Sequence, residues 1–139
     1  MSSTPYQTTV GVANPDIFFV TIPVFAASAI TNADELIDYI PGFNFQVVKI
    51  DFVTVTPITT SGKTATINPK IDGTVVPGTA TALAGTQAKG VVANVWTSST
   101  TPTYGGPTSK LKITASSVTA FTEGAGYFLV QLHNIGNLA

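Results

Sequence analysis

The sequence predicts an all-β fold, namely an antiparallel two-sheet β-sandwich with one short helix. Hydrophobic residues make up 44% of the chain and charged residues only 9%, so Thr and Ser must supply much of the polar surface. Thr is β-branched and favours strands over helices. Apolar residues also alternate along several short segments, and turn-forming clusters separate these segments. A jelly roll is one form of such a sandwich, and an orthogonal barrel is the alternative.

The chain of 139 residues fits one domain. We expect residues 1–14 to form an N-terminal arm and residues 15–139 to form the β-sandwich domain. The net charge of −1, with no Arg, leaves no basic surface for a nucleic-acid backbone. The uncharged segment 17–33 is interrupted by polar residues and by proline, so we expect no membrane span. Because cysteine is absent, stability must come from packing or assembly.

The first strand pattern runs from Ile17 to Phe25, where apolar residues alternate with a second set of side chains. Pro23 has no N–H to donate, so this strand should lie at a sheet edge or pair on only one side at that residue. The next segment, Thr31 to Ile40, changes to helical spacing, with apolar residues at Ala33, Leu36, Ile37 and Ile40. It predicts the one short helix, with Thr31 or Asn32 as its cap.

The longest strand pattern runs from Phe45 to Thr56 and has apolar residues on both faces. One face carries Val48, Ile50 and Phe52, and the other carries Val47, Lys49, Asp51, Val53 and Val55. Two explanations are open. A β-bulge near Phe52-Val53 would shift the alternation, or another subunit would cover the second face.

Later strands are separated by turns. Asp72-Gly73 predicts a type I′ hairpin turn, because both central residues of that turn need positive φ. Further strands are expected at Val91–Trp96, Leu111–Ala115 and Gly126–Leu132, and the stretch from Thr97 to Thr108 should be a loop. In the last strand Phe128, Val130 and Leu132 share one face.

The sequence shows no pattern of catalytic residues. Ser61-Gly62-Lys63-Thr64 imitates the end of a phosphate-binding loop, but Pro57 stands where the motif needs its first glycine, and a strand pattern follows. The single histidine, His133, excludes a His-cluster metal site. We therefore expect no enzymatic activity and no cofactor.

Three acidic residues, Asp34, Glu35 and Asp38, stand close together in the predicted helix. We interpret them as its solvated face, because acidic residues favour a helix N-terminus. A calcium site is the alternative, since several oxygen ligands are what that ion prefers.

Two aromatic residues are candidates for contact with a partner or a glycan. Trp96 and Tyr104 flank or occupy the predicted loop, where an aromatic face can stack on a sugar or on a protein surface. The alternatives are a core position for Trp96 and simple loop packing for Tyr104.

Four segments together point to a known group of proteins: Tyr39–Phe43, Val48–Val53, Thr59–Ile67 and Ser117–Gly124. Together they resemble a group of small structural proteins encoded by tailed bacteriophages, over about residues 16 to 132. The resemblance implies a virion protein that decorates or cements the head, with no catalytic residues and with the major capsid protein as its partner.

The residues agree with this implication, because a chain with few charges and two-sided apolar strands should bury surface against copies of itself or a shell. We therefore expect a homotrimer on the capsid surface of the virion. A carbohydrate- or receptor-binding module of a phage fibre or tail is the alternative. In the arm, Val10 and Val12 would add a strand to a neighbouring subunit's edge while Tyr6 anchors it in a groove; a disordered tail is the other interpretation.

Overall fold

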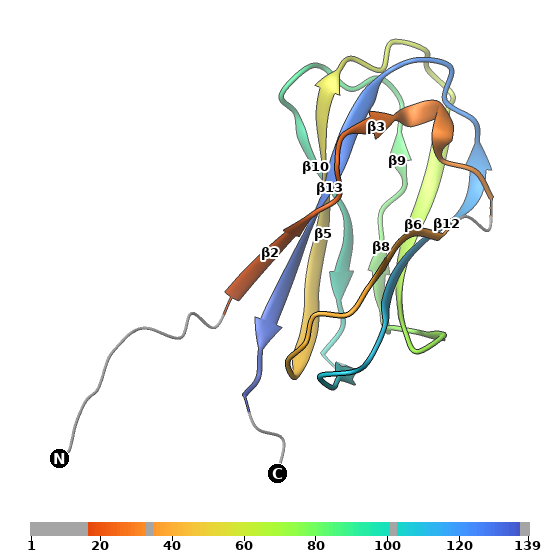
Figure 1. Ribbon diagram of the computed structural model, residues 1–139. Helices are drawn as coiled ribbons and strands as arrows, with labels where there is room; N and C mark the ends of the chain where they lie inside the picture. The colour runs from red at the N-terminus through yellow and green to blue at the C-terminus, as the bar shows by residue number, and fades with distance from the viewer. Residues whose placement is uncertain (1–16, 33–34, 101–102, 137–139) are drawn as a thin grey trace, which may run out of the picture.

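Two antiparallel β-sheets pack face to face in the computed structural model of the protein (Figure 1). The structure describes residues 17–32, 35–100 and 103–136. The predicted all-β sandwich is therefore confirmed. No helix within these ranges is long and apolar enough to cross a membrane. The predicted N-terminal arm lies outside the described residues.

In the described part of the chain the larger sheet has seven strands, in the order β2-β13-β5-β10-β8, with β3 beside β13 and β11 beside β5. Its strands are β2 (Ile17–Thr21), β3 (Phe25–Ala26), β5 (Phe45–Thr56), β8 (Gly78–Ala80), β10 (Val92–Ser98), β11 (Tyr104–Gly105) and β13 (Ala125–Asn134). The smaller sheet has the order β4-β12-β6-β7, with β9 beside β6. Its strands are β4 (Glu35–Tyr39), β6 (Thr64–Ile71), β7 (Thr74–Val75), β9 (Leu83–Ala84) and β12 (Leu111–Thr119).

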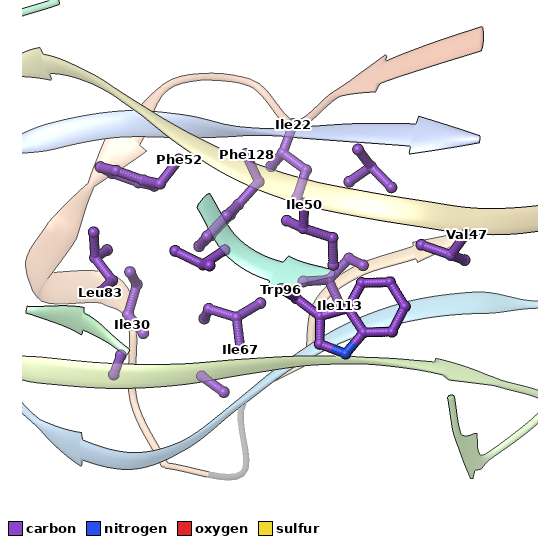
Figure 2. Packing of buried hydrophobic residues seen from close by; sticks show 14 of the residues in the cluster. Ile22, Ile30, Val47, Ile50, Phe52, Ile67, Leu83, Trp96, Ile113 and Phe128 are labelled. Atoms are coloured by element: carbon purple, nitrogen blue, oxygen red, sulfur yellow. The ribbon is translucent and has the colours of Figure 1, made fainter. Parts of the chain in front are cut away.

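The core fills the space between the two sheets (Figure 2). The last strand, β13, alternates as predicted, since Phe128, Val130 and Leu132 are all buried. Ile67 and Ile113 contribute to the same core from the smaller sheet, and Figure 2 shows them with Phe128 between the layers. Alternation along each strand therefore assigns one face of each sheet to the core.

A β-bulge explains part of the mixed faces of β5, namely the burial of Val47, whereas Val53 and Val55 remain on the side away from the core. Leu132 pairs with Val47 and Gln131 pairs with Lys49, so Val48 is an extra residue without a partner on β13. The bulge changes which residues point inward: Val47 before it and Ile50 after it are both buried.

A second register shift leaves Val55 without a partner on β13, because Ala125 pairs with Thr56 and Gly126 pairs with Thr54. β5 therefore has two bulges, one at Val48 and one at Val55, two residues beyond the Phe52-Val53 position that the sequence predicts.

The predicted helix at residues 31–40 is wrong, because residues 35–39 form strand β4 beside β12. Ile113 pairs with Ile37 and Thr114 pairs with Glu35, which makes Leu36 the extra residue of another bulge. Leu36 and Ile37 are consequently both half-buried, and two adjacent apolar residues imitate helical spacing. The helical structure described nearby is a single 3₁₀ turn, η2 (Ala27–Ala29).

The loss of the helix also changes the roles of its polar residues. Asn32 does not cap a helix. Its side-chain oxygen accepts the backbone N–H of Val118, near the end of β12, at 2.7 Å. Asp38 forms an exposed ion pair with Lys110 at 3.5 Å. Since residues 35–39 are extended, Asp38 does not share a helical face with Asp34, which lies outside the described residues.

Two local predictions are confirmed. Asp72 and Gly73 have φ values of 50° and 84°, as a type I′ turn requires, and they join β6 to β7. The first strand pattern lies at the edge of the larger sheet, where Pro23 separates β2 from β3. The positions of proline and of Asp-Gly were therefore sufficient to locate an edge and a hairpin.

Trp96 is the largest fully buried side chain, and its ring packs against the backbone of β8. A Cβ atom on Gly78 would lie within 2.6 Å of the Thr97 carbonyl oxygen and would also collide with the Trp96 ring. Glycine at this position therefore lets the indole fit between β8 and the core.

We expect Gly78→Ala to destabilise the fold by about 1–3 kcal/mol, because the added methyl group overpacks a rigid site. Gly106→Ala is the matched control, since its Cβ would meet its nearest atoms at 3.8 and 3.9 Å, an ordinary contact distance. Urea denaturation followed by circular dichroism measures both. Equal stability of the two variants would contradict the close packing at Gly78.

The hydroxyl of Thr54 is buried and has no hydrogen-bond partner. Replacing it by a methyl group in Thr54→Val removes an unpaired polar atom, so we expect the free energy of unfolding to rise by about 1 kcal/mol. Thr114→Val is the matched control, because the Thr114 hydroxyl donates to the Asn68 carbonyl at 2.9 Å and its loss should destabilise. Thermal denaturation of both variants tests these opposite signs.

Candidate interaction face

The larger sheet turns one set of side chains away from the core, and we call this surface the outer face. Along β5 and along β13, the residues that alternate with the buried ones point away from the core. Residues of β2 and β10 that pair with these outward residues lie on the same side of the sheet. The outer face consists of Ile17, Phe19, Thr21, Gln46, Lys49, Asp51, Val53, Val55, Val92, Asn94, Thr97, Tyr104, Tyr127, Leu129, Gln131 and His133.

Large apolar side chains are exposed on the outer face. Phe19 at one margin and Val92 toward the other are each 57% exposed, and Ile17 is 48% exposed. Val53 and Tyr127 lie between these margins as directly paired neighbours and are half-buried. The side of a sheet that faces water normally carries polar residues. Large apolar side chains on this side are therefore typical of a surface that another molecule covers.

The two charged residues of the outer face neutralise each other. Asp51 is only 6% exposed, and its carboxylate lies 3.4 Å from the Lys49 ammonium group and accepts the side-chain N–H of Asn94 at 3.1 Å. Thr97 extends this network by donating to the Asn94 oxygen at 2.9 Å. The carboxylate thus lies in the middle of the face, paired and already largely shielded from water, so covering the face leaves no unpaired charge buried.

The structure separates the two aromatic candidates. Trp96 is a core residue, so its ring offers no face to a partner or a glycan. Tyr104 is 50% exposed and belongs to the outer face, where β11 pairs with β5 opposite Gln46. The stretch predicted as a loop therefore includes the end of β10 and the short strand β11. The other candidates, Tyr6, Val10 and Val12, lie outside the described residues.

The hollows that border the sheets are shallow. One, of about 240 Å³, lies at the margin of the outer face where Pro23 and Val24 separate β2 from β3, beside Tyr127. Another, of about 340 Å³, lies between Pro57-Ile58-Thr59 and residues 86–89. Among the described residues no three His, Cys, Asp or Glu side chains group together as metal ligands. The turn at Ser61-Gly62 connects β5 of the larger sheet to strand β6 of the smaller sheet, whereas a phosphate-binding loop would lead into a helix.

Sequence reasoning missed a carboxylate that joins two loops. Glu123 accepts the backbone N–H groups of Thr59 and Thr60 at 2.8 and 2.6 Å, and the Thr60 hydroxyl at 2.7 Å. It also accepts the hydroxyl of Thr122. These bonds, the Thr122 and Thr60 hydroxyls foremost, lower the pKa of Glu123 from 4.5 to about 2. Apart from the adjacent Thr122, the donors stand more than 60 positions away, so no local motif marks Glu123.

Glu123→Gln tests this loop contact through its pH dependence. The folded-state pKa is lower than the unfolded value, so the contribution is complete above pH 4.5 and is lost as the pH falls toward about 2. We expect the variant to melt below the wild type at pH 7, with the difference shrinking toward pH 2. Melts by circular dichroism from pH 2 to 7 measure this. Asp38→Asn controls for loss of one surface charge, and a difference that stays constant with pH would contradict the assignment.

Comparisons with protein-family models, with curated proteins and with solved structures found no match to this chain.

Proposed function

We propose that the protein is a non-enzymatic structural subunit of a phage virion, which lays its outer face on the major capsid protein and so decorates or cements the head. The observation that carries this proposal is the exposed apolar outer face, whose Lys49 and Asp51 charges are already paired. Covering such a face with protein removes apolar surface from water and buries no unpaired charge. The resemblance to small phage structural proteins supplies the location.

The chemistry of the surface favours a binding role in a large assembly. The hollows described above are open and lack a group of metal ligands, whereas the sheet face is broad and rigid. On a symmetric shell, many copies bind side by side, so that modest contacts in each copy suffice for stable decoration. A rigid sheet also loses little conformational entropy when it is covered.

One observation favours glycan binding on a fibre or tail as a second candidate. The Tyr104 ring is exposed at one end of the outer face, and its strand neighbour Gln46 lies opposite His133. An exposed aromatic ring beside amide and imidazole groups is suited to stacking on a sugar and to hydrogen bonding with its hydroxyls.

Co-sedimentation with heads that lack this chain tests the proposal. We expect wild-type protein to sediment with the heads and Val92→Lys to bind at least about tenfold more weakly, because it places a charge in the covered surface. Val75→Lys is the matched control, since Val75 is 53% exposed on β7 of the smaller sheet. Equal loss in both variants would contradict the outer face as the contact surface.

A polysaccharide column distinguishes the second candidate. Retention of the wild type that is lost in Tyr104→Ala, without any sedimentation with heads, would reverse the ranking of the two functions. Sedimentation with heads that Tyr104→Ala leaves intact would support decoration.

A further inference from the structure

The free edge of β2 differs from the other sheet edges of the described chain. β2 is five residues long, Ile17-Phe18-Phe19-Val20-Thr21, and contains no charged residue. β4, at the edge of the smaller sheet, contains Glu35 and Asp38. β8 and β7, at the opposite edges, have only three and two residues. Charged residues and short strands normally protect edges from pairing with another chain, and β2 has neither protection.

The ladder between β2 and β13 shows which backbone groups are open. The N–H of Ile22 donates to the Phe128 carbonyl at 3.1 Å. In an antiparallel ladder every second residue bonds to the same neighbour, and the pairing of β2 with β13 has no register shift. Phe18 and Val20 therefore bond to β13, whereas the N–H and C=O groups of Ile17, Phe19 and Thr21 point to the open side.

We propose that β2 pairs antiparallel with β2 of a second copy of this chain, about a two-fold axis at Phe19. The three open residues are spaced symmetrically about Phe19, so this register sets Phe19 opposite Phe19 of the second copy and Ile17 opposite Thr21. Each of the open N–H and C=O groups of the three residues then has a partner. A different register would leave some of these groups unpaired.

The side chains support the same partner. Phe19 and Ile17 are 57% and 48% exposed at the margin of the outer face, and pairing would bring the two Phe19 rings side by side across the strands. The two outer faces would join into one continuous surface without bringing like charges together, because β2 carries none. The contact is smaller than a standard stable interface, so we expect a dissociation constant on the order of 100 μM.

Phe19→Pro is the decisive variant. Proline removes the N–H that points to the open side and leaves intact the bonds that Phe18 and Val20 make to β13, so the fold tolerates it at this edge. In sedimentation equilibrium from about 10 μM to 1 mM, we expect the wild type to form dimers and Phe19→Pro to associate at least tenfold more weakly. Val92→Thr is the matched control, because Val92 is equally exposed on the same face but not on β2. It should dimerise like the wild type.

Hydrogen exchange of the wild type tests the pairing without a substitution, and so covers the case in which Phe19→Pro fails to fold. The amides of Ile17, Phe19 and Thr21 should become protected as the concentration rises, while those of Phe18 and Val20 should be protected throughout. Protection of these three amides that does not change with protein concentration would overturn the proposal. So would a monomer at 1 mM, or the homotrimer expected from the sequence, because a two-fold contact of this kind forms dimers.

Deleting residues 2–12 tests the other available occupant of the edge, the chain's own N-terminal segment. We expect the dimer constant to change by less than about threefold. If the Phe19 amide is protected at 10 μM and the deletion exposes it, the segment occupies the edge and the proposal fails. These measurements use purified protein without heads, so their outcome is independent of the proposed decoration function.

Discussion

The structure depends on the burial of two apolar sheet faces against each other. Three aromatic rings of the larger sheet form part of its side of this contact: Phe128 of β13 lies 5.1 Å from Phe52 of β5 and 5.7 Å from Phe25 of β3, measured between ring centroids. With so few charges and no disulfide in the chain, this packing has no substitute. The bulges at Val48 of β5 and at Leu36 of β4 both contribute to this packing, because each turns an apolar residue back toward the core.

The same burial explains why the outer face is unusual. Once the inner positions of β5 and β13 are filled, residues such as Val53 and Leu129 remain on the other side of the strands. In an ordinary exposed sheet, polar residues would occupy these positions. The charged residues of this face, Lys49 and Asp51, form an ion pair with each other, so neither charge depends on water alone for a partner. The outer face is therefore suited to contact with protein.

Sequence patterns predicted those features that depend on neighbouring residues. The Asp72-Gly73 turn, the edge at Pro23 and the inward set of Phe128, Val130 and Leu132 were all accessible in this way. Segment 31–40 failed because a bulge at Leu36 is specified by pairing with β12, more than 70 residues away. The positions of the β5 bulges, at Val48 and Val55, are likewise set by the pairing with β13.

The candidate site was predictable only in part. Apolar residues on both faces of Phe45–Thr56 indicated a second covered surface, and the odd-numbered residues of β13 carried a similar signal that was overlooked. Trp96 and Tyr104 are alike as aromatic residues beside a loop, yet one faces the core and the other faces solvent. The extra residue Val95, at a register shift of β10, turns Trp96 toward the core, and no pattern in the sequence marks this shift.

The position of β13 has a consequence for how the chain folds during synthesis. β13 separates β2 from β5 in the sheet, although both precede it in the chain, and Figure 1 shows it between them. While the ribosome is still making the preceding strands, β2 has no strand to pair with, and β5 lacks its neighbour on the β13 side. The nascent sandwich therefore stays open until its last described strand emerges, and folding is a late event that exposes these strands to chaperones or to misassembly until then.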